Sequence, residues 1–263
     1  MGKGAPLLDL RDISKAFGSV QALTDVDFEV RQGEVMALVG DNGAGKSTLI
    51  KCVAGIHPHD TGEIYFDGKL ASIHGPKDAA KLGIEVVYQD LALCDNLDVV
   101  QNMYLGREAH DWFQRLKEPI MEKRTSETML SLAVTSLNSI RQKVASLSGG
   151  QRQSVAVARA VMWNSRLVIL DEPTAALGVA QTAQVLGLVK RLADEQNLAV
   201  VIISHNLHDV FEVAHRITVL RLGRNVGVYE REKTTPEEVV FAITAGKPVK
   251  VSGIAGTSEG KTV

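Results

Sequence analysis

The stretch that decides the fold is a glycine-rich loop, which reads Gly40-Asp41-Asn42-Gly43-Ala44-Gly45-Lys46-Ser47-Thr48. It fits the pattern G-x-x-x-x-G-K-[ST], in which backbone N–H groups surround a polyphosphate. The apolar run Glu34–Val39 before it is typical of a buried strand, and Leu49–Ala54 after it is typical of a helix. A helix that begins at the loop adds about half a positive charge beside the phosphates. The stretch therefore predicts a site for a nucleoside triphosphate.

The expected chemistry of this loop rests on two side chains and on its backbone. Lys46 would reach the β- and γ-phosphates, and the hydroxyl of Ser47 would bind Mg²⁺. We expect the other residues from Gly40 to Thr48 to contact the nucleotide as well. A chance match in a glycine-rich turn is the alternative. The strand before the loop and the helix after it argue against that alternative.

Composition and charge limit the classes to which this chain can belong. A chain of 263 residues with 45% hydrophobic residues can bury a substantial core. The formal net charge is −2 and no strongly basic block is present, so charge does not suggest a nucleic-acid partner, although charge alone does not exclude one, and we expect none. Two cysteines, Cys52 and Cys94, are too few for a disulfide framework or a zinc site. The uncharged stretch Met129–Ile140 is shorter than the roughly 18 apolar residues of a spanning helix. We therefore expect a soluble protein that reaches a membrane only through a partner.

Hydrophobic periodicity predicts strands and helices on both sides of the loop. Leu7–Val30 alternates in the manner of strands, and Ile217–Tyr229 reads as a hairpin that turns at Gly223. Helical periodicity dominates from about residue 91 to 164, with a surface linker expected at Glu108–Lys123. Further runs of buried-strand type are Gly83–Gln89, Leu167–Glu172 and Ala199–His205, and further helices are expected at Val179–Asn197 and from Thr235.

Three of the apolar runs end in polar residues, and each of these residues suits phosphoryl transfer to water. The ends are Gln89, the pair Asp171-Glu172, and His205. Ligands bind at the carboxyl ends of strands in open α/β sheets, so these side chains are expected near the phosphate site. Asp171 is suited to bind Mg²⁺, and Glu172 can polarise the attacking water.

A second motif, Leu147-Ser148-Gly149-Gly150-Gln151, opens a predicted helix. With the glycine-rich loop and the polar strand ends, it resembles the nucleotide-binding subunit of an ATP-binding cassette (ABC) transporter over roughly residues 7 to 246. The resemblance implies ATP and Mg²⁺ as cofactors and ATP hydrolysis as the activity. It also implies an α/β fold, with a P-loop NTPase core of mostly parallel sheet, an antiparallel β subdomain and an inserted α-helical subdomain.

The resemblance gives each residue of the expected site a role. Gln89 becomes a ligand of the metal and the attacking water, and Asp171 lies in the metal-binding strand end. Glu172 becomes the catalytic base, and His205 a switch at the γ-phosphate. Phe17, for which position alone favours core packing, becomes the aromatic residue that stacks on adenine.

The second motif implies a dimer. Two glycines at a helix start make an anion cradle without a lysine. In the family, this cradle of Ser148, Gly149, Gly150 and Gln151 closes on ATP held by the opposite subunit, so we expect a homodimer. One departure from the family pattern follows Glu172. Gly178 stands where many members have Asp, which puts in doubt how the two sites communicate.

Domain boundaries follow from the same resemblance. We expect an ATP-binding core from residues 1–90 and 165–246, a helical signature subdomain from 91–164, and a disordered tail from 247–263. The segment Asp90–Asn102 is expected to line a surface that docks the membrane permease. Its leucines, Leu91, Leu93 and Leu97, would then be exposed, and the alternative is that they pack inside the helical lobe.

Within the family, the sequence most resembles the cassettes of bacterial monosaccharide importers of the ribose, xylose and fructose types. The stretches that carry this resemblance are Tyr88–Leu97, Asn102–Glu108 and Pro173–Gly178. Such a cassette implies an integral membrane permease, indirectly a periplasmic solute-binding protein, and a position at the cytoplasmic face of the plasma membrane. Two alternatives stay open: an ABC ATPase that acts on DNA or the ribosome, and a regulatory module that binds ATP without hydrolysing it.

Overall fold

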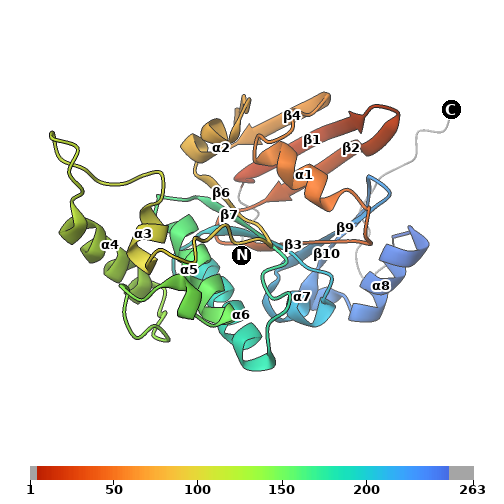
Figure 1. The fold of residues 1–263 in the computed structure, drawn as a ribbon. Helices are drawn as coiled ribbons and strands as arrows, with labels where there is room; N and C mark the ends of the chain where they lie inside the picture. The colour runs from red at the N-terminus through yellow and green to blue at the C-terminus, as the bar shows by residue number, and fades with distance from the viewer. Residues whose placement is uncertain (1–4, 249–263) are drawn as a thin grey trace.

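Two β-sheets organise the chain in a computed structural model, which describes residues 5–248 (Figure 1). The first is antiparallel and has the strand order β2-β1-β4-β5. Its strands are β1 (Leu8–Phe17), β2 (Val20–Val30), β4 (Thr61–Phe66) and β5 (Lys69–Leu70). The alternating N-terminal residues thus form the predicted strands, with Leu8 opposite Val30 and Phe17 opposite Val20.

The second sheet has six strands in the order β10-β9-β3-β8-β7-β6. All of its neighbouring strands are parallel except the β9–β10 hairpin. The strands are β3 (Val35–Val39), β6 (Ile84–Val87), β7 (Leu167–Asp171), β8 (Ala199–Ile203), β9 (Arg216–Arg221) and β10 (Arg224–Glu230). This confirms the predicted α/β fold with a mostly parallel sheet and a separate antiparallel one.

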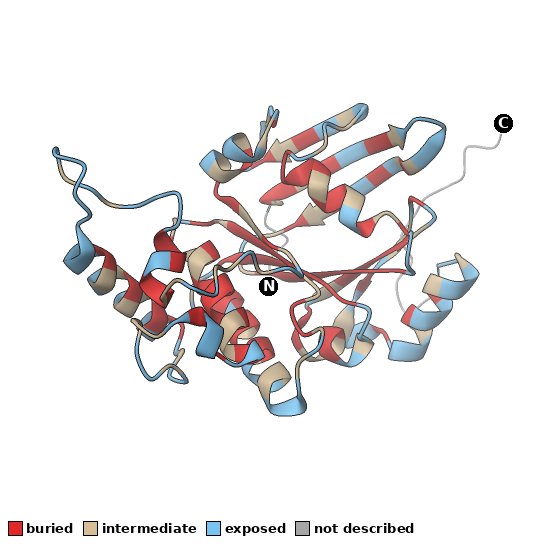
Figure 2. Cartoon of the chain, in the orientation of Figure 1, coloured by how far each residue is buried: buried red, intermediate tan, exposed pale blue. Residues whose placement is uncertain are grey.

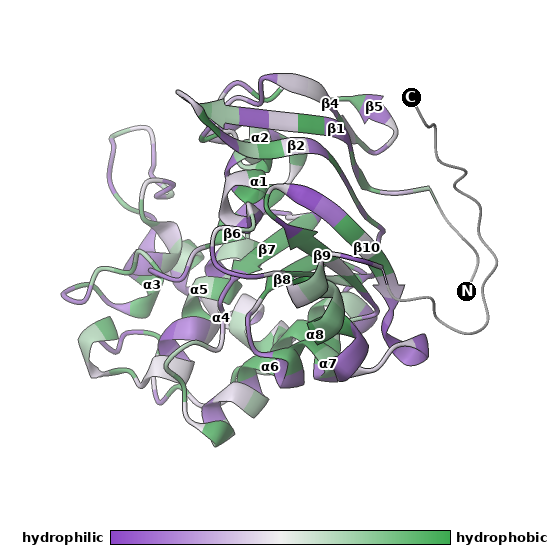
Figure 3. Cartoon of the chain, turned by 90° about the vertical axis from the view of Figure 1, so that its right-hand side faces the viewer, coloured by the Kyte–Doolittle hydropathy of each residue, from purple (hydrophilic) through white to green (hydrophobic). Residues whose placement is uncertain are grey.

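The continuous apolar runs are explained by burial on both faces of the larger sheet. In β3, Met36 and Leu38 belong to the core shared with the antiparallel sheet and α1, whereas Val35, Ala37 and Val39 belong to the core under the helices. β8 divides its side chains in the same way. Figure 2 shows the strands of the larger sheet as mostly buried, and Figure 3 shows β7 and β8 as hydrophobic.

The helices occupy the places that the periodicity predicts, with additions. They are α1 (Lys46–Val53), α2 (Pro76–Leu82), α3 (Val99–Tyr104), α4 (Glu118–Ser131), α5 (Gly149–Val161), α6 (Val179–Asp194), α7 (Leu207–Val213) and α8 (Pro236–Ala245). Two short 3₁₀ turns lie at η1 (Val144–Ser146) and η2 (Arg231–Lys233). Between β6 and β7 the chain forms α3, α4, η1 and α5. α8 begins as predicted, because Thr235 and Glu238 form a reciprocal capping box.

The predicted surface linker at Glu108–Lys123 is wrong over its last six residues, because α4 begins at Glu118. The physical reason is Pro119, which lies in the first turn of α4, where a helix tolerates proline because that N–H has no partner within the helix. Before it, a short turn is closed by a bridge between His110 and Leu116.

The β9–β10 hairpin turns at Gly223 and reaches back to the glycine-rich loop. The N–H of Gly223 donates to the carbonyl of Ala44 over 3.0 Å, and its own carbonyl accepts from the N–H of Thr24 over 2.8 Å. A Cβ atom at Gly223 would lie 2.5 Å from the Ala22 carbonyl oxygen, so only glycine allows this contact. The β9–β10 hairpin and the start of β2, which are distant in the sequence, therefore both help to hold the glycine-rich loop in place.

Within residues 5–248, no helix is both long and apolar enough to cross a membrane. Most of the predicted tail, residues 249–263, lies outside the part of the chain that the structure describes.

Candidate nucleotide site

The glycine-rich loop joins β3 to α1, as its pattern predicts. Gly45 has φ of +100°, and a Cβ atom there would lie 2.8 Å from Leu23 and 2.9 Å from the Ala22 carbonyl oxygen. Gly40 has no room either, because its Cβ would lie 2.2 Å from the Leu220 carbonyl oxygen. Gly45 is the N-cap of α1 and has no side chain to occupy the first N–H groups of the helix. These groups are therefore free to face an anion.

Lys46 is buried, and its ammonium group is held by the loop itself. Its Nζ donates to the carbonyl oxygens of Gly40 over 2.7 Å and Asp41 over 3.0 Å. Burial lowers the pKa of Lys46, and the negative charges of Glu172, Asp171 and Asp41 oppose that change. A phosphate group would add further negative charge beside this buried cation and would favour its charged form.

Asp171 ends β7 and is half-buried beside Glu172. Burial raises the pKa of its carboxyl group, the charge of Glu172 raises it further, and Lys46 and Lys51 oppose both effects. Two adjacent carboxylates in a partly desolvated position are suited to a divalent cation. Among residues 5–248, no group of three His, Cys, Asp or Glu residues could hold a metal alone. A metal here would therefore need oxygen ligands from a hydroxyl, an amide or the substrate.

Glu172 and His205 meet although they follow different strands. Nδ1 of His205 lies 2.7 Å from Oε2 of Glu172. The backbone N–H of Glu172 donates to the carbonyl of Ile203 over 2.9 Å, which ties the two strand ends together. Glu172 has φ of +51°, a left-handed conformation that is uncommon for a residue with a side chain. Such strain persists only where the surroundings fix it, and it is concentrated at functional sites.

A cavity of about 540 Å³ connects these elements. Its walls include Gly40, Asp41, Asn42, Gln89, Glu172 and His205. The structure therefore brings the polar ends of β6, β7 and β8 to the loop, as expected. Gln89 lies two residues beyond the end of β6. Three residues of α8, Val240, Ile243 and Thr244, also line the cavity. No chemical signal in the sequence points to them, because α8 is recognisable only as a capped helix.

Phe17 is not a core residue, and the core-packing alternative is wrong. Its side chain lies at the end of β1 and is 44% exposed. The ring of His57 contacts it edge-on, with centroids 5.2 Å apart, and Nζ of Lys15 lies 5.4 Å from its centroid. An aromatic ring that is presented to solvent in this way can stack on a nucleotide base.

The second motif begins α5, and none of its residues lines the 540 Å³ cavity. Ser148 is the N-cap, and it forms a reciprocal capping box with Gln151. The side chain of Gln151 also donates to the carbonyl of Ser136. Gly149 and Gly150 lie in the first turn, where a helix has no internal acceptors for its N–H groups. The first turn of α5 therefore has N–H groups that can face an anion, and it does not share the cavity beside the glycine-rich loop.

Comparisons with known proteins agree with this geometry. The ABC transporter family matches residues 23–175. The chain is 45% identical to the xylose/arabinose import ATP-binding protein XylG of Sulfolobus acidocaldarius, over 91% of this chain and 94% of that protein. It is 43% identical to the fructose import ATP-binding protein FrcA of Rhizobium meliloti, over 95% of this chain and 98% of that protein.

Solved structures show the same fold. The ADP conformation of MJ1267, an ATP-binding cassette of an ABC transporter, superposes with a TM-score of 0.78 at 25% identity, over 92% of this chain and 96% of that chain. A dimeric structure of the cassette MJ0796 superposes with a TM-score of 0.72 at 25% identity, over 85% and 98% of the two chains. The chain described here belongs to the ABC transporter family and is one of its ATPase subunits.

Proposed function

We propose that this chain hydrolyses ATP to drive the uptake of a monosaccharide through a separate membrane permease. The observation that carries the catalytic part is the meeting of Glu172, His205 and Gln89 at one cavity with the loop that holds Lys46. The sugar part is supported by the names of the relatives, which are import proteins for xylose or arabinose and for fructose.

In this proposal the loop binds the phosphates and the strand ends act on water. Backbone N–H groups of residues 40–48 and the ammonium of Lys46 hold the β- and γ-phosphates, and Phe17 stacks on adenine. The carboxylate of Glu172 accepts a proton from the attacking water, and His205 keeps that carboxylate oriented toward the γ-phosphate. The shifted pKa values of Lys46 and Asp171, which burial causes, are typical of groups at functional sites.

Magnesium fits the donor set at this site. Asp171 carries an unfavourable half-buried charge that a divalent cation would neutralise. Ser47 and Gln89 supply neutral oxygen atoms, which are ligands that Mg²⁺ accepts together with phosphates. When bound, the ion would neutralise charge that develops on the phosphate oxygens.

A second copy of the chain is required for a complete site. The cradle formed by Ser148, Gly149, Gly150 and Gln151 lies away from the cavity on its own chain, so it is available to a nucleotide on another copy. The dimeric structure of the related cassette MJ0796 supports this arrangement. We further infer that residues 1–90 and 165–246 move as one body and residues 91–164 as another, so that ATP can draw the cradle inward.

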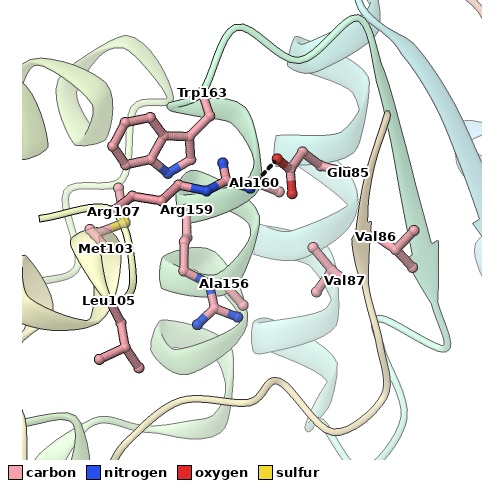
Figure 4. A pocket seen from close by; sticks show the side chains of 10 residues that line it. All are labelled: Glu85, Val86, Val87, Met103, Leu105, Arg107, Ala156, Arg159, Ala160 and Trp163. Carbon is pink, nitrogen blue, oxygen red and sulfur yellow. Dashed lines mark hydrogen bonds and ion pairs between the residues drawn. The ribbon is translucent and has the colours of Figure 1, made fainter. Parts of the chain in front are cut away.

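The permease would dock beside α3 and α5, where a hollow of about 220 Å³ opens (Figure 4). Glu85 and Arg107 form an ion pair of 3.0 Å in its wall, and Trp163 lies beside Arg107. The expected docking segment, residues 90–102, borders this region through Arg159, which donates to the carbonyls of Leu91 and Ala92. Leu91 and Leu93 are half-buried against the helical core, so part of their apolar surface is already used.

Docking at this hollow would place the chain at the cytoplasmic face of the plasma membrane, with a periplasmic solute-binding protein on the other side. The experiment that tests the function is sugar uptake into vesicles that contain the permease, with ATP and Mg²⁺ supplied on the side of this chain. Uptake that needs this chain and hydrolysable ATP supports the proposal. ATP hydrolysis that is stimulated by ribosomes or DNA instead would favour a non-transport ATPase. ATP binding without any hydrolysis would favour a regulatory module.

A further inference from the structure

A buried carboxylate outside the expected site connects the two catalytic loops. Asp209 lies in the first turn of α7 and is 2% exposed. Its Oδ2 accepts a hydrogen bond from the Thr174 hydroxyl over 2.6 Å, and its Oδ1 accepts one from the Asn206 side-chain amide over 3.0 Å. Burial of a carboxylate is costly unless hydrogen bonds compensate it, and both oxygens of Asp209 have such partners.

The two partners of Asp209 belong to different loops. Thr174 is two residues beyond Glu172, and Asn206 directly follows His205. The carboxylate therefore joins the loop that carries the proposed base to the loop that carries the proposed switch. It does so outside the cavity, because Asp209 is absent from the wall of the 540 Å³ cavity.

The loop after β7 needs such a connection because its backbone is strained. Glu172 has φ of +51° and Ala176 has φ of +62°, and neither is glycine. Left-handed residues with side chains cost energy and are held only by fixed surroundings. Between them, Thr174 is 9% exposed, and its hydroxyl bond to Asp209 joins this loop to α7.

The loop after β8 is organised differently and shows that the role of Asp209 is not that of a helix cap. Asn206 is itself the N-cap of α7, and its Oδ1 accepts the N–H of His208 over 3.1 Å. The N–H of Asn206 donates to the hydroxyl of Ser204 over 3.0 Å. The helix start is thus satisfied without Asp209, and the bond from the Asn206 amide to Asp209 serves to fix the Asn206 side chain to the neighbouring loop.

We propose that Asp209 is a positioning residue that keeps Glu172 and His205 in a fixed position relative to each other. This inference rests on the proposed function, in which Glu172 acts as the base. Loss of the connection would let the strained loop relax, so that the carboxylate of Glu172 spends less time facing the reacting phosphate. Turnover should then fall while ATP binding, which depends on the glycine-rich loop, stays.

The matched pair T174V and T174S tests the bond from Thr174. Valine keeps the shape and removes the hydroxyl, which leaves one oxygen of Asp209 unpaired, whereas serine keeps the hydroxyl. We expect T174V to lower kcat roughly tenfold, with the Kd for ATP within about twofold of wild type, and T174S to retain kcat. Equal kcat for the two variants would overturn the inference.

An exchange of the amide and the carboxylate tests the other bond. In D209N the new amide would face the amide of Asn206, and in N206D two carboxylates would face each other. The double variant N206D/D209N restores one donor and one acceptor at each contact. The amide at position 209 can accept from Thr174 through its oxygen and donate to the carboxylate at position 206. We expect each single variant to lose kcat and the double variant to recover most of it. If the fold-losses of kcat in the two single variants simply multiply in the double variant, the proposal is contradicted.

A background with E172Q separates this inference from the proposed function. If Asp209 acts through Glu172, then T174V should not lower the residual single-turnover rate of E172Q any further. A tenfold loss in both backgrounds would show a merely structural effect and overturn the inference alone. Wild-type turnover by E172Q itself would instead remove Glu172 from its role, and with it the proposed function on which this inference depends.

Discussion

Nδ1 of His205 lies 2.7 Å from Oε2 of Glu172, although the two residues follow different strands of the sheet. The histidine side chain is 72% exposed, whereas the Glu172 side chain is only 16% exposed. The His205 ring is thus open to solvent, whereas the Glu172 carboxylate is sheltered, although both line the cavity. The pair therefore offers an exposed ring that can contact a γ-phosphate and a sheltered carboxylate that can act on water.

Replacement of Glu172 by glutamine should stop turnover and keep nucleotide binding. The amide retains the shape and hydrogen bonding of the carboxylate but cannot accept a proton from water. We expect kcat to fall by about 10²- to 10⁴-fold, and ATP to trap a dimer that elutes earlier in size-exclusion chromatography. H205A should also depress turnover, with less effect on binding. Hydrolysis by E172Q at the wild-type rate would contradict this assignment.

Replacement of Lys46 by alanine should remove tight ATP binding. Its ammonium group already donates to the carbonyl oxygens of Gly40 and Asp41 in the loop. When ATP binds, the ammonium group would exchange these carbonyl oxygens for charged oxygens of the terminal phosphates. Equilibrium binding of a fluorescent ATP analogue measures the loss. K51A is a matched control on the same helix, because Lys51 lies in the last turn of α1. An unchanged Kd in K46A would defeat the proposed site.

Replacement of Asp171 by asparagine should stabilise the nucleotide-free protein and weaken its response to Mg²⁺. Burial and the charge of Glu172 raise the pKa of Asp171 above its ordinary value of 3.8, so the folded protein carries an unfavourable charge at neutral pH. For a carboxyl group with a raised pKa, stability falls as pH rises through the unfolded and folded values. The Tm of D171N should therefore exceed that of wild type at pH 7, and the difference should shrink toward pH 4.

The same variant provides its own functional check. Addition of Mg²⁺ and ATP should raise the Tm of wild type much more than that of D171N, because the neutral amide oxygen of asparagine binds Mg²⁺ more weakly than a charged carboxylate. A D171N protein that is less stable at pH 7 and responds fully to Mg²⁺ and ATP would refute both halves of this prediction.

The two cysteines should differ in their reactivity in the folded protein. Burial raises the pKa of Cys52 to about 11, so about one thiol in a thousand is ionised at pH 8. Cys94 is half-buried, so reagent has access to it. Iodoacetamide at pH 8 should therefore label Cys94 first, as followed by mass spectrometry, and both cysteines should react in guanidinium. Fast labelling of Cys52 in the native protein would show that α1 opens readily.

Replacement of Arg107 by alanine should uncouple transport without affecting the isolated subunit. Arg107 pairs with Glu85 in the hollow proposed for the permease and lies away from the nucleotide cavity. We expect basal ATPase activity within about twofold of wild type and a loss of most permease-dependent uptake. K81A is the control, because it removes a surface cation that pairs with Asp78 outside this hollow. Full uptake by R107A would place the docking surface elsewhere.

Much of the nucleotide site could be predicted because its chemistry lies at strand ends. The continuous apolar runs before Asp171 and His205 required strands buried on both faces, and parallel strands bring their carboxyl ends to one edge. Phe17 shows the limit of this reasoning. A lone aromatic residue between two strands has no periodic partners, so sequence position could not separate core packing from the exposed position that the structure shows.

Other features depend on contacts between segments that are distant in the sequence. Nothing near Asp209 indicates that Thr174 will donate to it, because the bond depends on the packing of α7 against the loop after β7. The start of α4 is hidden in the sequence for a different reason. Polar residues around Pro119 suggest a linker, although proline is common in the first turn of a helix.

The contact between Gly223 and Ala44 has a consequence for the order in which the chain folds. The glycine-rich loop is encoded early, but the hairpin that braces it lies near the other end of the fold. Contacts between such distant segments close late, because the chain between them must first be ordered. During synthesis, β3 and α1 can therefore form before the loop between them has its final shape. Competence to bind nucleotide should arise only after β9 and β10 have left the ribosome and added to the sheet.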